Sequence, residues 1–203
     1  MWIVDNFFKN PYDIRKKAIE SLKSDSYQDH HWPGRRADVP KDIQQQIFSK
    51  AKSIINDKSE LPEELIFRST FQYADKSYIV GYPHVDIESR YNCIVFLNTS
   101  APFNTGTEVY GERYGNISGT KGYMLDIFRD TQVKYYNSNR TFVEQFFFKR
   151  EINKLNSLFK DPCVISNKFN RAVIFDSLLV HRAQNYFGSS IKDSRLTIST
   201  FLK

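Results

Sequence analysis

The sequence is poor in cysteine, histidine and long apolar runs, and these shortages exclude several classes of protein. Its two cysteines, Cys93 and Cys163, lie far apart and without metal-ligand spacing, which excludes a disulfide scaffold and a zinc cluster. We interpret both as reduced thiols packed in the fold. No apolar run could span a bilayer, and the first residues lack the basic and apolar blocks of a signal peptide. The sequence therefore predicts a cytoplasmic protein without a membrane partner.

The chain also has little excess of charge of either sign. The net charge of the 203 residues is +6, which suits an anionic small molecule and permits nucleic acid without favouring it. The composition, 40% hydrophobic and 15% aromatic, is that of a globular protein, and the length fits a single domain over residues 1–203. Neither property defines an oligomeric state.

The first third of the chain carries helical signals. Residues 3–8 are largely apolar and suit a strand, and Asn10 before Pro11 is typical of a helix start. That helix is predicted to run to about Lys23. A second helix follows, with an apolar face made of Ile43, Ile47, Ala51 and Ile54. We expect residues 1–64 to form a helical support for the rest of the chain.

From residue 65 the pattern becomes that of short strands. They are expected at 67–73, 91–98, 107–110, 172–176 and 195–202. Residues 141–159 interrupt them as a helix, whose apolar stripe is contributed by Phe142, Phe146, Ile152, Leu155 and Phe159. Helices followed by many strands, with one helical insertion, indicate an α+β protein whose core, residues 65–203, is a β-sandwich or jelly roll.

Histidine is scarce, with four in the chain, and the spacing of one of them is chemically informative. His84 and Asp86 are separated by one residue, so in an extended segment both side chains point the same way. An imidazole and a carboxylate together suit Fe(II). The alternative is an ordinary surface loop after Pro83.

His181 follows two apolar runs, 172–176 and 178–180, which places it at the end of a buried strand. A side chain there is held rigidly, although a single histidine in that place is also typical of a hydrogen-bonded core residue. Together with His84 and Asp86 it would complete a set of two histidines and one carboxylate. Such a set leaves three positions on the ion for a cosubstrate and O₂.

The last strand has one polar face. Arg195, Thr197 and Ser199 alternate with Leu196 and Ile198, so the three polar side chains point to the same side. We interpret that face as the wall of a polar cavity, in which Arg195 pairs with a carboxylate through two hydrogen bonds and Thr197 adds a hydroxyl. The alternative is an edge strand with a solvated face.

The order His84-Val85-Asp86, then His181, then Arg195 resembles the H-x-D…H…R pattern of Fe(II)- and 2-oxoglutarate-dependent dioxygenases. Neighbouring segments resemble the prolyl-4-hydroxylase-like branch of that superfamily, and the opening of the chain resembles its small uncharacterised members from bacteria and phages. The segments similar to that branch are 81–86, 93–98, 104–108, 170–176 and 195–197.

The resemblance implies a double-stranded β-helix, which is a distorted and cupin-like jelly roll with iron between two sheets. His84, Asp86 and His181 would be the metal ligands and the catalytic residues. Related halogenases lack the carboxylate so that chloride can take its place. The presence of Asp86 therefore argues against halogenation.

The same resemblance implies 2-oxoglutarate as cosubstrate and O₂ as oxidant. The far carboxylate of 2-oxoglutarate would pair with Arg195, aided by Thr197 and Tyr73, although Tyr73 is equally well an ordinary strand aromatic. Turnover would hydroxylate an unactivated C–H bond, by family analogy in a peptidyl or free amino-acid side chain, and release succinate and CO₂. The alternatives are the same chemistry on a nucleobase or other small metabolite, and a non-catalytic jelly-roll binding module.

The segment from Trp32 to Arg36 is predicted to be a loop, because Pro33-Gly34 breaks regular structure. Loops on a rigid β scaffold commonly carry specificity. Trp32, Arg35 and Arg36 are therefore candidate substrate contacts that would favour an acidic or aromatic substrate. The alternative is an ordinary exposed turn.

Overall fold

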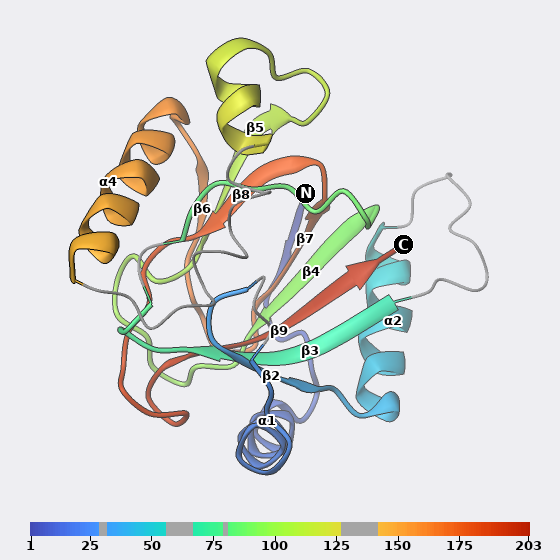
Figure 1. Ribbon diagram of the computed structural model, residues 1–203. Coiled ribbons are helices and arrows are strands. Elements are labelled where there is room, and N and C mark those ends of the chain that lie inside the picture. The colour runs from blue at the N-terminus through green and yellow to red at the C-terminus, as the bar shows by residue number, and fades with distance from the viewer. Residues whose placement is uncertain (29–31, 56–66, 79–80, 127–141) are drawn as a thin grey trace.

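The computed structural model describes residues 1–28, 32–55, 67–78, 81–126 and 142–203, which form two antiparallel sheets with helices outside them (Figure 1). The strands of the large sheet, in spatial order, are β1 (Trp2–Val4), β7 (Ala172–Asp176), β4 (Tyr91–Phe96), β9 (Arg195–Leu202), β3 (Phe67–Ala74) and β2 (Arg35–Asp38). The small sheet has the order β6 (Cys163–Ile165), β5 (Thr107–Arg113) and β8 (Leu179–Ala183). The expected α+β jelly roll is confirmed.

The outer face of the large sheet is apolar and is covered by α1 (Pro11–Ser24) and α2 (Lys41–Ile55) (Figure 1). Both helices were expected from the sequence, and each buries a stripe at helical spacing, such as Ile14, Ala18 and Leu22 in α1. From the strands, Phe71, Leu196 and other residues of that face join the same core. Because this core occupies the outer face of β3 and β9, only their opposite face is available to line a functional site.

The inner face of the large sheet points towards the small sheet. Directly opposed residues on neighbouring strands share a face. Arg36, Gln72, Thr197 and Phe96 lie opposite one another across β2, β3, β9 and β4, and so form one row on this inner face. Phe96 joins an apolar cluster of both sheets, whose buried members are Phe96, Val109, Ile165, Val173 and Phe175. The inner face therefore changes from apolar at β4 and β7 to polar at β9, β3 and β2.

The helical insertion α4 (Phe142–Leu158) packs beside the small sheet (Figure 1). Phe148, Ile152 and Leu155 are buried there, but Phe146 is 61% exposed, so its assignment to the buried stripe is wrong. Phe146 lies six residues before Ile152, which places it about 120° away around the helix. Of Phe142, only the place in α4 is described, not the side chain.

The first 64 residues contribute more than helices. They supply β1 and β2, the two edge strands of the large sheet, so Arg35 and Arg36 lie in a strand and the predicted loop ends at Gly34. The strand expected at residues 3–8 is the shorter β1, Trp2–Val4, whereas β2 depends on pairing with β3, which local signals do not reveal. His30 and His31 lie outside the described residues. No helix among the described residues is long and apolar enough to cross a membrane.

Candidate metal centre and its cavity

His84 and His181 are brought together by an antiparallel bridge between the segment before β4 and strand β8. The His84 backbone N–H donates to the His181 carbonyl, and the reverse bond is also made, both at 3.0 Å. Cross-strand partners of this kind project to the same side, and the two ring centroids are 4.3 Å apart. Gly81 allows this close approach, because a side chain there would collide with the Ala183 carbonyl.

Asp86 completes the group from the same extended segment. Its backbone N–H donates to the Ser177 carbonyl at 3.0 Å, and its Oδ2 accepts a 2.6 Å hydrogen bond from Asn92 of β4. One ligand atom from each of His84, Asp86 and His181 can be chosen so that all three lie within 4.8 Å of one another. The structure thus brings together the three residues that the sequence named as ligands.

Hydrogen bonds on the far side of each imidazole orient the rings. His84 Nδ1 lies 2.9 Å from the Tyr82 carbonyl oxygen, and His181 Nδ1 lies 2.8 Å from that of Leu179. A carbonyl can only accept, so both Nδ1 atoms carry the hydrogen and both Nε2 atoms are left to bind a cation. Such outer hydrogen bonds are typical of metal-binding histidines.

The protonation states also suit a metal. Burial, assisted by the neighbouring His181, lowers the pKa of His84 to about 4, so the ring is neutral at pH 7. Burial opposes ionisation of Asp86, but His181, His84 and Asn92 outweigh it and hold the pKa of Asp86 below its usual value. Neutral imidazole and ionised carboxylate are the forms that bind a metal ion.

The contact between Asp86 and His181 tests whether a cation fits here. Asp86 Oδ2 and His181 Nε2 are 3.1 Å apart, and both side chains are more than nine-tenths buried. With Nδ1 donating to Leu179, a neutral His181 ring would present a lone pair to an anionic oxygen. A metal ion bound to both atoms would stabilise two buried acceptors at this distance. The donor set therefore fits a divalent metal.

The three ligands line one side of a cavity between the sheets, which we call the central cavity. Its other walls include Arg36, Tyr186 and Arg195. Arg195 is 5% exposed, and its guanidinium donates to the Thr105 carbonyl at 3.3 Å and to Thr107 Oγ1 at 3.2 Å. Among the described residues no carboxylate forms an ion pair with it, so its buried charge is held by neutral groups. A ligand carboxylate would stabilise this charge.

Two hydroxyl groups lie near Arg195. Thr197 is fully buried on the same face of β9, and its Oγ1 has no hydrogen-bond partner in the described part of the chain. Tyr186, in the β8–β9 segment, lines the cavity, and burial raises its pKa to about 12, so the hydroxyl stays protonated. The positive charges of Arg195 and Arg36, which line the same cavity, oppose this shift. The sequence reading missed Tyr186.

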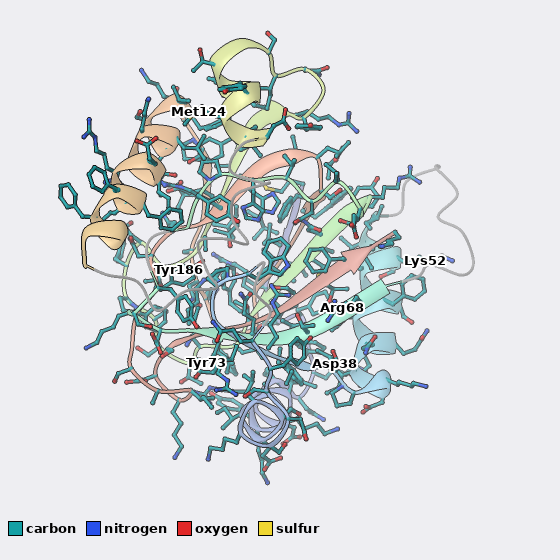
Figure 2. The ribbon with its side chains drawn as sticks, in the orientation of Figure 1. Asp38, Lys52, Arg68, Tyr73, Met124 and Tyr186 are labelled. Carbon is teal, nitrogen blue, oxygen red and sulfur yellow. The ribbon has the colours of Figure 1, made fainter. Side chains whose placement is uncertain are left out.

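Tyr73, which the sequence associated with the cosubstrate, lies elsewhere. It is paired with Leu196 across β3 and β9 and packs against the core under α1 and α2, on the outer face. It is not among the residues that line the central cavity. Figure 2 labels both tyrosines, with Tyr73 close to α1 and Tyr186 farther from that helix. Tyr186, and not Tyr73, lines the cavity together with Arg195.

Of the three candidate substrate residues, two line the central cavity and one does not. Trp32 and Arg36 line the central cavity, and the Trp32 ring centroid is 5.4 Å from that of His84. Arg35, the neighbour of Arg36 in β2, points to the opposite side and donates to Ser26 Oγ at 2.9 Å. It is exposed, as expected from strand alternation. Arg35 is thus excluded from the cavity wall, and Arg36 is part of it.

Solved structures with a similar fold include prolyl hydroxylases. A prolyl-4-hydroxylase from Pseudomonas putida gives a TM-score of 0.57 at 11% identity, over 100% of this chain and 91% of that one. A Trichoplax adhaerens prolyl hydroxylase in complex with a hypoxia-inducible-factor peptide fragment gives 0.56 at 11%, over 99% and 82%. HygX from Streptomyces hygroscopicus, with nickel, 2-oxoglutarate and hygromycin B bound, gives 0.57 at 12%, over 98% and 81%.

The chain therefore has the double-stranded β-helix fold of the Fe(II)- and 2-oxoglutarate-dependent oxygenases. Residues 1–202 match the sequence profile of a family of unknown function, DUF6445, and the chain belongs to that family. Among curated protein sequences none matches it. The description of the family names no activity, so the function has to be argued from the cavity.

Proposed function

We propose that this protein is an Fe(II)- and 2-oxoglutarate-dependent dioxygenase that hydroxylates an unactivated C–H bond. The observation that carries the proposal is one cavity holding both a His84, Asp86 and His181 donor set and a buried Arg195 whose described partners are all neutral. Two imidazoles and one carboxylate suit Fe(II). A guanidinium held by neutral groups suits the distal carboxylate of 2-oxoglutarate.

The residues of the chain have separate tasks in this proposal. His84, Asp86 and His181 hold the metal, and Asn92 keeps the Asp86 carboxylate in place through its 2.6 Å hydrogen bond. Bound Fe(II) supplies the activation of O₂, coupled to conversion of 2-oxoglutarate into succinate and CO₂, with one oxygen atom going to the substrate. Arg195 orients the cosubstrate by pairing with its far carboxylate.

The buried hydroxyls and the aromatic wall have supporting tasks. In this proposal Thr197 Oγ1, which has no partner among the described residues, and the protonated hydroxyl of Tyr186, a cavity-lining residue, donate to the carboxylate held by Arg195. Trp32 packs against His84 at the edge of the metal site and excludes water from that side. We propose a peptidyl or free amino-acid side chain as substrate, since relatives of this fold are described with a peptide fragment and with a small molecule bound.

Turnover of 2-oxoglutarate tests the proposal directly. The purified protein with Fe(II), ascorbate, 2-oxoglutarate and air is expected to form succinate and CO₂ in equal amounts, slowly even without substrate. Chelation of the iron or replacement by Zn²⁺ should stop the reaction, because Zn²⁺ has no redox chemistry. Absence of succinate from iron-loaded protein would contradict the assignment and leave a binding module with a jelly-roll fold.

Tyr186→Phe is expected to raise the Michaelis constant for 2-oxoglutarate by about tenfold or more. A hydrogen bond to a charged group contributes about 1.5–3 kcal/mol, which corresponds to roughly ten- to hundredfold in affinity. Tyr73→Phe is the matched control, because it removes the same hydroxyl from the outer face of the sheet and should leave the constant unchanged. A larger effect of Tyr73→Phe than of Tyr186→Phe would restore the assignment made from the sequence.

A further inference from the structure

The central cavity contains a second buried arginine that the proposed chemistry does not use. Arg36 is 4% exposed and projects from β2 onto the inner face of the large sheet. Its Nη1 donates to Thr70 Oγ1 at 3.0 Å, and its guanidinium carbon is 5.1 Å from the Trp32 ring centroid. A cation buried in a cavity wall is costly, and a cavity that keeps one is suited to an anionic ligand.

Arg36 is close to the metal site but separate from Arg195. Trp32 connects the two regions, because its ring lies 5.4 Å from that of His84 on one side and 5.1 Å from the Arg36 guanidinium on the other. In the strand register Arg36 of β2 lies opposite Gln72 of β3, and Gln72 lies opposite Thr197 of β9. Arg195 comes two residues before Thr197 and lies opposite Ala74 instead. A molecule held at Arg36 would therefore lie beside the metal ligands without displacing a carboxylate at Arg195.

The lining of the cavity is richer in arginine than in carboxylates. Among the described residues that line it, Arg36, Arg182 and Arg195 are cationic and Asp86 is the one carboxylate. Arg182 forms an ion pair with Glu108. Gln72 and Ser199 are neutral polar residues on the same wall. A lining of this composition favours anionic ligands.

We propose that Arg36 binds a carboxylate of the substrate, and that the substrate is a free amino acid or a related small carboxylic acid. This inference rests on the proposed function, since it names the substrate class of the same cavity. A planar guanidinium pairs with a carboxylate through two hydrogen bonds. The terminal carboxylate of a small molecule can reach a side chain that is only 4% exposed. The internal backbone of a peptide carries no such group.

The two tryptophans of the chain, Trp2 and Trp32, allow a binding assay that does not depend on turnover. In a Trp2→Phe background the emission comes from Trp32, which contacts Arg36. The protein, loaded with Zn²⁺ and saturated with 2-oxoglutarate, is titrated with each free L-amino acid and with its C-terminal amide. At least one acid is expected to change the Trp32 emission saturably and to bind at least about tenfold more tightly than its amide.

Three variants test the role of Arg36. Arg36→Gln should lose the preference for the acid, and Arg36→Lys, which keeps the charge, should retain part of it. Arg35→Gln is the matched control, because Arg35 precedes Arg36 and points out of the cavity, and it should keep the full preference. Thermal melting of each variant reports whether it is folded. If Arg36→Gln does not fold, comparison of Arg36→Lys with the unsubstituted protein still tests the role of Arg36.

The inference is overturned if no acid binds, if acids and amides bind equally, or if folded Arg36→Gln keeps the preference. Tighter binding of a peptide with a blocked C-terminus would also overturn it in favour of a peptidyl substrate. Failure of the proposed function has a different signature. It would leave the Zn²⁺-loaded protein with its preference for acids, while the iron-loaded protein formed no succinate.

Discussion

Replacing His84 with alanine is expected to abolish stable binding of a divalent metal and, with it, all turnover of 2-oxoglutarate. His84 supplies one of three ligand atoms that lie within 4.8 Å of one another, and the remaining pair would hold an ion only weakly. Asp86→Ala should have the same result, because the carboxylate is the only anionic ligand of the set. Metal content after dialysis and succinate formation measure the two effects.

Glu88→Ala is the control for the loss of a carboxylate near the site. Glu88 follows Asp86 by two residues, but its side chain is 85% exposed and contacts only Lys203, at 3.7 Å, among the interactions described. This variant should keep one metal ion per chain and full turnover. Metal binding and activity that survive in His84→Ala would show that the triad is not the metal site.

Arg195→Ala is expected to raise the Michaelis constant for 2-oxoglutarate by at least about tenfold. Removing the charged partner of a buried carboxylate typically costs roughly 2–5 kcal/mol. The metal should still bind, because Arg195 contacts Thr105 and Thr107 rather than the ligands. Steady-state succinate formation at varied 2-oxoglutarate, together with metal analysis, separates these two outcomes.

Arg113→Ala controls for the loss of an arginine elsewhere. Arg113 forms a half-exposed ion pair with Asp176 at 3.1 Å, outside the central cavity. Surface pairs of this kind contribute little to stability, so the Michaelis constant should be unchanged. If Arg195→Ala behaved like Arg113→Ala, the cosubstrate would have to be anchored by another residue.

The grouping of His84, Asp86 and His181 could be predicted from the sequence because its signals are local. His84 and Asp86 share a face through the two-residue period of an extended segment, and His181 follows a long apolar run. The helices were also readable, since α1 and α4 begin and end within a few residues of the predicted positions and α2 spans the predicted apolar face, whereas β2 and β6 were not predicted as strands. Long periodic segments are the ones that sequence patterns define well.

The inward-pointing faces of β3 and β2 could not be predicted from the sequence. Alternation in β3 separates Tyr73 from Gln72, but it does not say which of them meets the helices. That is decided by the packing of α1 and α2 on the side of Phe71 and Tyr73, which is a contact between distant parts of the chain. The same limit affected Arg35 and Arg36, whose strand exists only through pairing with β3. Tyr186 lies outside any regular element, where no periodicity reveals its direction.

The pairing of β1 with β7 has a consequence for how this domain folds during synthesis. Trp2 lies opposite Ile174, so nearly everything between residues 2 and 174 is synthesised before β1 can pair. At about 5–20 residues per second, β1 waits on the order of ten seconds or longer for that partner. His181 follows β7 in the sequence, so the three candidate ligands come together only after β7 has been made. During that interval an apolar strand is without its hydrogen-bonding partner and is exposed to aggregation.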